Sequence, residues 1–101
     1  VFRRLGEYQK AISDYNTSAR LNPRDSDVFF NRGVVYFHIG RYRSSIRDMT
    51  QAIKLSPENA DAYYWRARAY ESLGDLKKAK ADDLKSSQIP ETPTPEPITD
   101  F

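Results

Sequence analysis

Two neighbouring segments of the chain place apolar residues at helical spacing. Between residues 26 and 39, Phe29, Gly33 and Tyr36 follow the i, i+4, i+7 pattern of one helical face. Between residues 42 and 55, a second stripe consists of Tyr42, Ile46, Met49, Ile53 and Leu55. The pattern predicts two consecutive amphipathic helices.

Residues typical of helix ends flank both stripes. Gly40 can adopt the left-handed conformation that ends a helix without steric cost, and Pro57 prevents the second helix from continuing. Asp25 and Asn59 each precede a helical segment and can cap it. We therefore expect an antiparallel helix pair joined at Gly40.

The same pattern returns every 34 residues, beginning with Gly6, Gly40 and Gly74. Six further sets share the period: Asp14, Asp48 and Asp82; Leu21 and Leu55; Pro23 and Pro57; Asp25 and Asn59; Arg32 and Arg66; Tyr36 and Tyr70. So many coincidences at one offset indicate an internal repeat. The repeat predicts the end of an earlier helix in residues 1–5, then helices over residues 7–21, 26–39, 41–55, 60–73 and 75–88.

Residues 29–57 carry a recognisable repeat motif in FFNRGVVY (29–36), GRY (40–42) and AIKLSP (52–57). This motif resembles the tetratricopeptide repeat family. Residues 60–89 match it in register through Tyr63, Ala67, Tyr70, Gly74 and Ala79, and residues 1–25 through Gly6, Tyr8, Leu21 and Pro23. The chain departs from the family at Ser45, where Ala is preferred, and at Arg32 and Arg66, where many members carry Leu.

The resemblance implies an all-α fold, a right-handed α-solenoid of antiparallel helix-turn-helix repeats. Residues 1–25 would be the C-terminal part of a first repeat, 26–59 a complete repeat and 60–89 a second complete repeat. Residues 90–101 would be a Pro-rich acidic tail. Its four prolines predict an extended polyproline II segment that acts as a spacer or as a ligand.

Composition narrows the function classes. The chain has 101 residues, no cysteine and a net charge of +2. It shows no dense Lys/Arg patch, no membrane-length apolar stretch and no signal-peptide pattern, so we expect neither a nucleic-acid nor a membrane partner. The first residues read like the end of a helix, so we expect part of a longer protein. A cytoplasmic location, with the cytoskeleton as a possible site of association, fits this composition.

Catalytic chemistry finds little support in the sequence. His38 is the only histidine, and it has no partner in helical register. The four glycines are explained by helix ends and close packing, so no phosphate loop is indicated. We therefore expect no enzyme activity, no cofactor and no metal.

Charged residues at the repeat period predict structural ion pairs. Arg32 and Arg66 are expected to face inward, where an arginine needs a partner. The aspartates of the other helix supply one, so we expect pairing among Arg32, Arg66, Asp14, Asp48 and Asp82. A ligand-binding role for the arginines is the alternative.

The resemblance also implies a concave face lined by the first helix of each repeat. Its residues would form a partner-binding groove: Phe30, Asn31, Val34, Phe37, His38, Tyr64, Trp65 and Arg68. The exposed aromatics favour a contact site, and the alternative is that neighbouring repeats or the tail cover them. The family's clamp for C-terminal carboxylates of heat-shock chaperones is matched only at Asn31. Asp61 and Trp65 stand where its Lys and Arg are expected.

These features favour a protein-interaction and scaffolding module that binds a peptide segment of a partner in its groove. The alternative is a structural component of a large assembly, for example cytoskeletal or ciliary, whose repeats are buried by neighbouring subunits. Either function would place the chain in a larger repeat protein or a multi-subunit complex.

Overall fold

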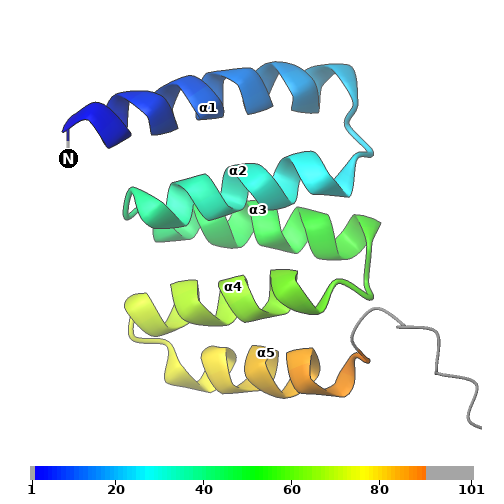
Figure 1. Cartoon of the computed structure of the whole chain (residues 1–101). Helices are drawn as coiled ribbons and strands as arrows, with labels where there is room; N and C mark the ends of the chain where they lie inside the picture. Colours follow the sequence, from blue (N-terminus) through cyan, green and yellow to red (C-terminus); the bar gives the residue numbers. More distant parts are fainter. Residues whose placement is uncertain (1, 91–101) are drawn as a thin grey trace, which may run out of the picture.

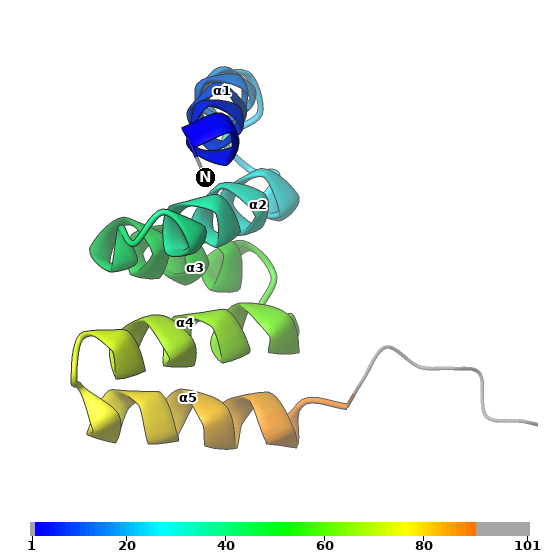
Figure 2. The ribbon, with the colours of Figure 1, turned by 60° about the vertical axis from the view of Figure 1, so that its left-hand side comes forward.

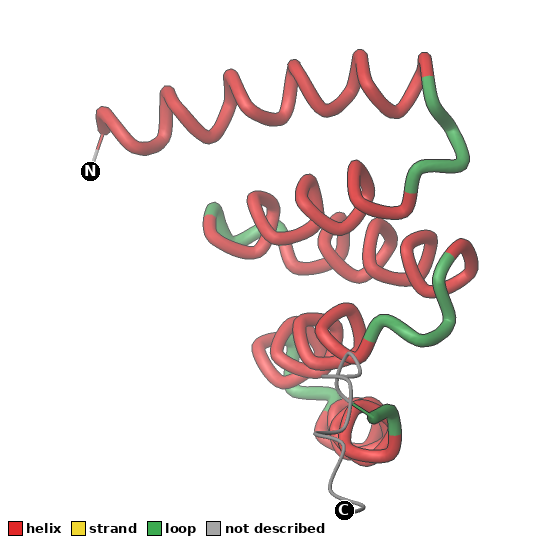
Figure 3. Tube along the Cα trace, turned by 45° about the vertical axis from the view of Figure 1, so that its right-hand side comes forward, coloured by secondary structure: helices red, strands yellow, loops and turns green. Residues whose placement is uncertain are grey.

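The computed structural model describes residues 2–90, with side chains from Gly6 onward, and this part of the chain is entirely helical or loop. It contains helices α1 (Phe2–Leu21), α2 (Ser26–His38), α3 (Tyr42–Leu55), α4 (Ala60–Ser72) and α5 (Leu76–Gln88). Successive helices run antiparallel and stack in chain order (Figure 1). The stack twists, because α1 is seen nearly end-on in Figure 2 whereas α5 is seen end-on in Figure 3. The Pro-rich tail predicted beyond Pro90 lies outside the described residues.

Side-chain caps start three of the helices. Asp25 accepts a hydrogen bond from the backbone N–H of Asp27 at the start of α2, and Asn59 accepts one from Ala62 at the start of α4. Asp75 begins α5 in the same manner. Each cap satisfies an N–H that the helix itself cannot pair. The bounds of α2 to α5 agree within one residue with those predicted from the repeat.

Glycine ends α2 and α4 in one and the same motif. Gly40 and Gly74 have φ values of 80° and 85°, which lie in the left-handed region. After Gly40, the N–H of Arg41 donates to the carbonyl of Tyr36 at 2.8 Å, and after Gly74 the N–H of Asp75 donates to Tyr70 at 2.9 Å. These are the 6→1 hydrogen bonds of the Schellman motif, which turns the chain into the next helix.

Gly6 does not end a helix, contrary to the sequence-based expectation. It lies inside the continuous helix α1, which begins at Phe2 and has no break between residues 1–5 and 7–21. The turns at Gly40 and Gly74 are closed by hydrogen bonds to carbonyls of the preceding helix. At Gly6 the backbone stays helical, at the modest cost of a glycine in a helix interior.

The core is made of small residues that allow the helices to approach closely. Its fully buried centre consists of Met49, Ala52 and Ala62. Gly33 in α2 packs against α3 so tightly that a Cβ there would lie 2.9 Å from Cε of Met49. This close approach explains why residue 33 is a glycine.

The stack is curved. Within residues 2–90, α2 approaches α4 directly, whereas the backbones of α3 and α5 do not come into contact. In a curved stack, alternate helices approach each other on the inner side and move apart on the outer side. The inner face is therefore formed by α2 and α4, and the outer face by α3 and α5. None of the described helices is both long and apolar enough to span a membrane.

Candidate functional site

The inner face carries a continuous set of aromatic rings. Phe37 and His38, in the last turn of α2, lie against Trp65 of α4 with ring centroids 5.3 Å and 5.8 Å apart. Tyr64 packs edge-on against Trp65 at 5.9 Å. The edge-to-face geometry of these pairs is the arrangement that aromatic quadrupoles prefer. The structure thus brings together four of the predicted groove residues from two helices.

Tyr8 of α1 extends this surface to a third helix. Its ring stacks on the imidazole of His38 at 5.9 Å with an interplanar angle of 12°. Sequence reasoning did not include Tyr8, because it lies on the second helix of its repeat and not on the first. We call the residues Tyr8, His38, Trp65 and Tyr64 the aromatic strip.

The predicted groove residues differ in how accessible they are. Phe30, Val34 and Trp65 are half-buried and pack against the core of Met49, Ala52 and Ala62, so they mainly hold the helices together. Asn31 and His38 are exposed. Tyr64 is 46% exposed despite its size. The side chains that a partner could reach are therefore Asn31, His38 and Tyr64, with the half-buried rings beneath them.

Arg68 is already paired within the chain. Its guanidinium forms an ion pair with Asp83 of α5 and lies 5.1 Å from the ring centroid of Tyr64. Glu71 adds a weaker contact at 3.9 Å. The cation therefore fixes the ring of Tyr64 and has little unbalanced charge left for a ligand.

A periodic polar network joins the helices behind this face. Nε and Nη2 of Arg32 donate to the two carboxylate oxygens of Asp48 at 2.8 Å and 2.7 Å. Nη1 of Arg32 reaches back to Asn16 of α1 at 2.9 Å. One repeat later, three bonds link Arg66 to Asp82 and to Thr50 in the same way. Each arginine therefore joins three successive helices.

Hydrogen bonding to the aspartates raises the pKa of both arginines. The bond to Asp48 raises the pKa of Arg32, and burial opposes this only in part. The pKa of Arg66 is raised in the same way by Asp82.

Asn16 and Thr50, which share the repeat spacing, were not predicted as members of this polar network. Asp14 is exposed and forms no ion pair among the described residues. The arginine it would pair with falls before residue 1 in the repeat register.

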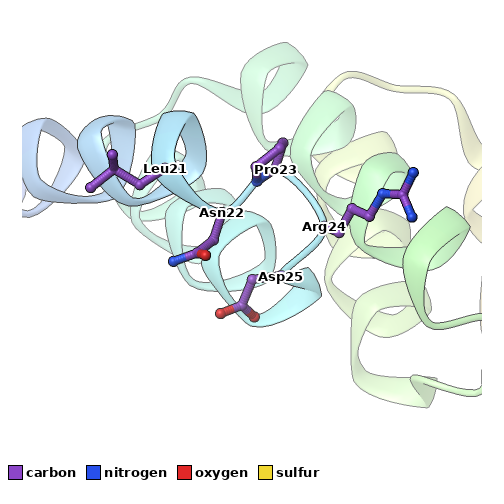
Figure 4. A pocket seen from close by; sticks show the side chains of 5 residues that line it. All are labelled: Leu21, Asn22, Pro23, Arg24 and Asp25. Atoms are coloured by element: carbon purple, nitrogen blue, oxygen red, sulfur yellow. The ribbon is translucent and has the colours of Figure 1, made fainter.

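One further hollow brings no chemical groups together. The loop between α1 and α2 borders an open space of about 490 Å³. Figure 4 shows the side chains of Leu21, Arg24 and Asp25 there, and they diverge from one another. No group of three potential metal ligands occurs in the part of the chain that the structure describes.

Stacked antiparallel helix pairs, a 34-residue period and a curved inner face define an α-helical repeat solenoid. Models of the tetratricopeptide repeat match residues 2–69 and 60–85. The chain belongs to the tetratricopeptide repeat family, whose repeats form a non-catalytic interaction fold.

Similar solved structures come from the same family of folds. The second such domain of Spaghetti (RPAP3), solved bound to the HSP90 peptide SRMEEVD, is 29% identical with a TM-score of 0.81; the match covers 88% of this chain and 82% of that one. A crystal structure of MamA is 26% identical with a TM-score of 0.81, over 87% of this chain and 52% of that one. MamA AMB-1 is 24% identical with a TM-score of 0.79, over 85% and 51%. The chain thus spans about half the length of MamA. No curated protein matches the sequence.

Proposed function

We propose that this chain binds a peptide segment of a partner protein along its inner face. The observation that carries the proposal is the aromatic strip, which runs across α1, α2 and α4 with Tyr64 and His38 accessible. Trp and Tyr are enriched in binding hot spots, and Asn31 is a further exposed residue on α2. The similar RPAP3 domain, bound to a peptide in its structure, adds support.

The charges around the strip indicate what kind of segment would bind. Asp27, Asp61 and Glu71 are exposed on α2 and α4, and Arg68 is neutralised by Asp83. Among the described residues of α2 and α4, a C-terminal carboxylate would meet these acidic side chains, and the arginines of both helices are already paired. We therefore propose an apolar or mixed segment, and not a bare C-terminal carboxylate, as the ligand.

A direct test begins with peptides selected by phage display on the immobilised full chain. Calorimetry then compares wild type with Tyr64→Ala, Asn31→Ala and the control Lys54→Ala, which alters an exposed residue of α3. We expect Tyr64→Ala to weaken binding by about tenfold or more and Lys54→Ala to leave it unchanged. Equal affinities for all four proteins would exclude the inner face as the site.

A structural role in an assembly is the second candidate, because large apolar side chains are exposed at both ends of the stack. They are Leu21 at the end of α1, and Leu76 and Leu84 on α5. Neighbouring subunits would cover these side chains. Self-association in sedimentation velocity that Leu84→Asp abolishes, together with no selected peptide, would favour this role.

A further inference from the structure

A second recessed surface is lined by none of the residues of the aromatic strip. It is a hollow of about 350 Å³ between α3, the end of α4 and the start of α5, lined by Arg43, Ile46, Tyr70, Leu73, Asp75 and Lys78. The backbones of α3 and α5 do not contact each other, and Tyr70 near the end of α4 lines the space between them. We call these six residues the outer hollow.

The lining of the outer hollow combines an apolar floor with a basic rim. Ile46, Tyr70 and Leu73 form the floor, and Leu73 is 40% exposed. Arg43 and Lys78 stand on opposite sides, on α3 and α5. Lys78 lies 5.6 Å from the ring centroid of Tyr70, which keeps its charge over the floor.

The basic charge around the outer hollow is only partly balanced. A neighbouring hollow of about 310 Å³ shares Arg43 and Leu73 and adds Arg41. Arg41, Arg43 and Lys78 thus face a single carboxylate, that of Asp75. This carboxylate caps α5 and contacts Lys78 only at 3.9 Å. Arg41 and Arg43 form no ion pair among the described residues. A ligand with carboxylates would balance this charge.

The repeat register shows that the fold does not require these cations. One period earlier, Arg43 corresponds to Gln9 and Lys78 corresponds to Ser44. The apolar floor is kept at that position, since Ile46 corresponds to Ile12 and Tyr70 to Tyr36. The two cations are therefore absent from the preceding interval of the stack, whereas the apolar floor is present in both intervals.

We propose that the outer hollow binds an acidic segment of a partner protein, with an apolar side chain on Leu73 and carboxylates at Arg43 and Lys78. This site is separate from the proposed inner groove and selects a different ligand. The inner face presents acidic side chains, so one chain could hold a neutral or mixed segment on one side and an acidic segment on the other.

The test uses a fluorescein-labelled peptide that alternates aspartate with leucine, titrated with the full chain in a fluorescence anisotropy assay. The double variant Arg43→Glu/Lys78→Glu should weaken binding by about tenfold or more, and added salt should weaken wild-type binding. Leu73→Ser should also weaken it. The matched control Lys54→Glu/Lys85→Glu makes the same charge change near the other ends of α3 and α5, and it should bind as wild type does.

Several results would overturn the proposal. They are no binding by wild type, equal loss in both double variants, or loss in Tyr64→Ala, which would place the peptide on the inner face. Binding that appears only when Glu91, Glu96 and Asp100 are changed to their amides would identify the chain's own acidic end as the occupant, and not a partner. Circular dichroism of each variant separates lost binding from lost folding.

Discussion

Arg32 and Asp48 form a two-point ion pair in which both carboxylate oxygens accept from one guanidinium at 2.7–2.8 Å. The side chain of Asp48 is only 4% exposed and that of Arg32 is 18% exposed. Parallel bonds of this kind are directional as well as strong. Because the third bond of Arg32 goes to Asn16 of α1, the pair fixes the register of three helices at once.

Removing the carboxylate should be costly. Asp48→Ala leaves the guanidinium of Arg32 half-buried without its counterion, so we expect a loss of up to about 3 kcal/mol in the free energy of unfolding. Asp14→Ala alters the equivalent position of the previous repeat, where the carboxylate is exposed and forms no ion pair among the described residues, and it should change stability by less than about 0.5 kcal/mol. Urea denaturation of both variants measures the contrast, and equal effects would refute the structural role of the pair.

The pH dependence of this contribution has a definite sign. The pKa of Arg32 is higher in the folded chain, so its stabilisation is complete below the unfolded-state pKa and is lost only as the pH rises through the folded pKa. Since the pKa of arginine lies well above the range tested, the stability difference between wild type and Asp48→Ala should be the same at about pH 7 and about pH 10. Denaturation at both pH values checks this, and a difference that shrinks at the higher pH contradicts it.

Replacing Gly33 or Gly6 with alanine should change the stability of the fold in opposite directions. A Cβ at Gly33 would lie 2.9 Å from Met49 and 3.1 Å from Cβ of Asp48, whose side chain Arg32 holds in place. Gly33→Ala should therefore destabilise the fold by about 1–3 kcal/mol. Gly6 lies inside α1 with open space around it, so Gly6→Ala should stabilise by about 0.5–1 kcal/mol. Thermal melts with equal midpoints for both variants would speak against the packing described here.

Ser45 offers a test of core polarity. It is fully buried, and its Oγ has no hydrogen-bond partner in the part of the chain that the structure describes. Because an unpaired buried hydroxyl is costly, Ser45→Ala should stabilise by about 1 kcal/mol. The neighbouring Ser44→Ala, which is only half-buried, should gain less. A loss of stability in Ser45→Ala would mean that the hydroxyl is satisfied in solution.

The repeat period made most of the fold predictable and only part of the site. Equivalent residues recur in equivalent surroundings, so the sequence could predict the bounds of α2 to α5 and suggest which charged residues to examine for ion pairs. Contacts between non-equivalent positions leave no such signal. The stacking of Tyr8 on His38 and the pairing of Arg68 with Asp83 depend on how neighbouring helices curve and twist.

Gly6 and Asp14 mark a second limit of sequence reasoning. Gly6 has the sequence position of a turn but lies inside the continuous helix α1. Asp14 likewise has the position of a network member but forms no ion pair among the described residues. The outer hollow was missed for a third reason, because Arg43 and Lys78 belong to different helices and are separated by α4 in the chain.

The inner face is the proposed binding surface for a partner segment. Its most direct test is a titration of the ¹⁵N-labelled full chain with a display-selected peptide, followed by backbone amide and Trp65 indole shifts. We expect the largest changes at Asn31, His38, Tyr64 and Trp65, with little change at the control position Lys54. Changes confined to the outer face around Arg43 and Leu73, or to the exposed leucines at the two ends, would contradict the claim.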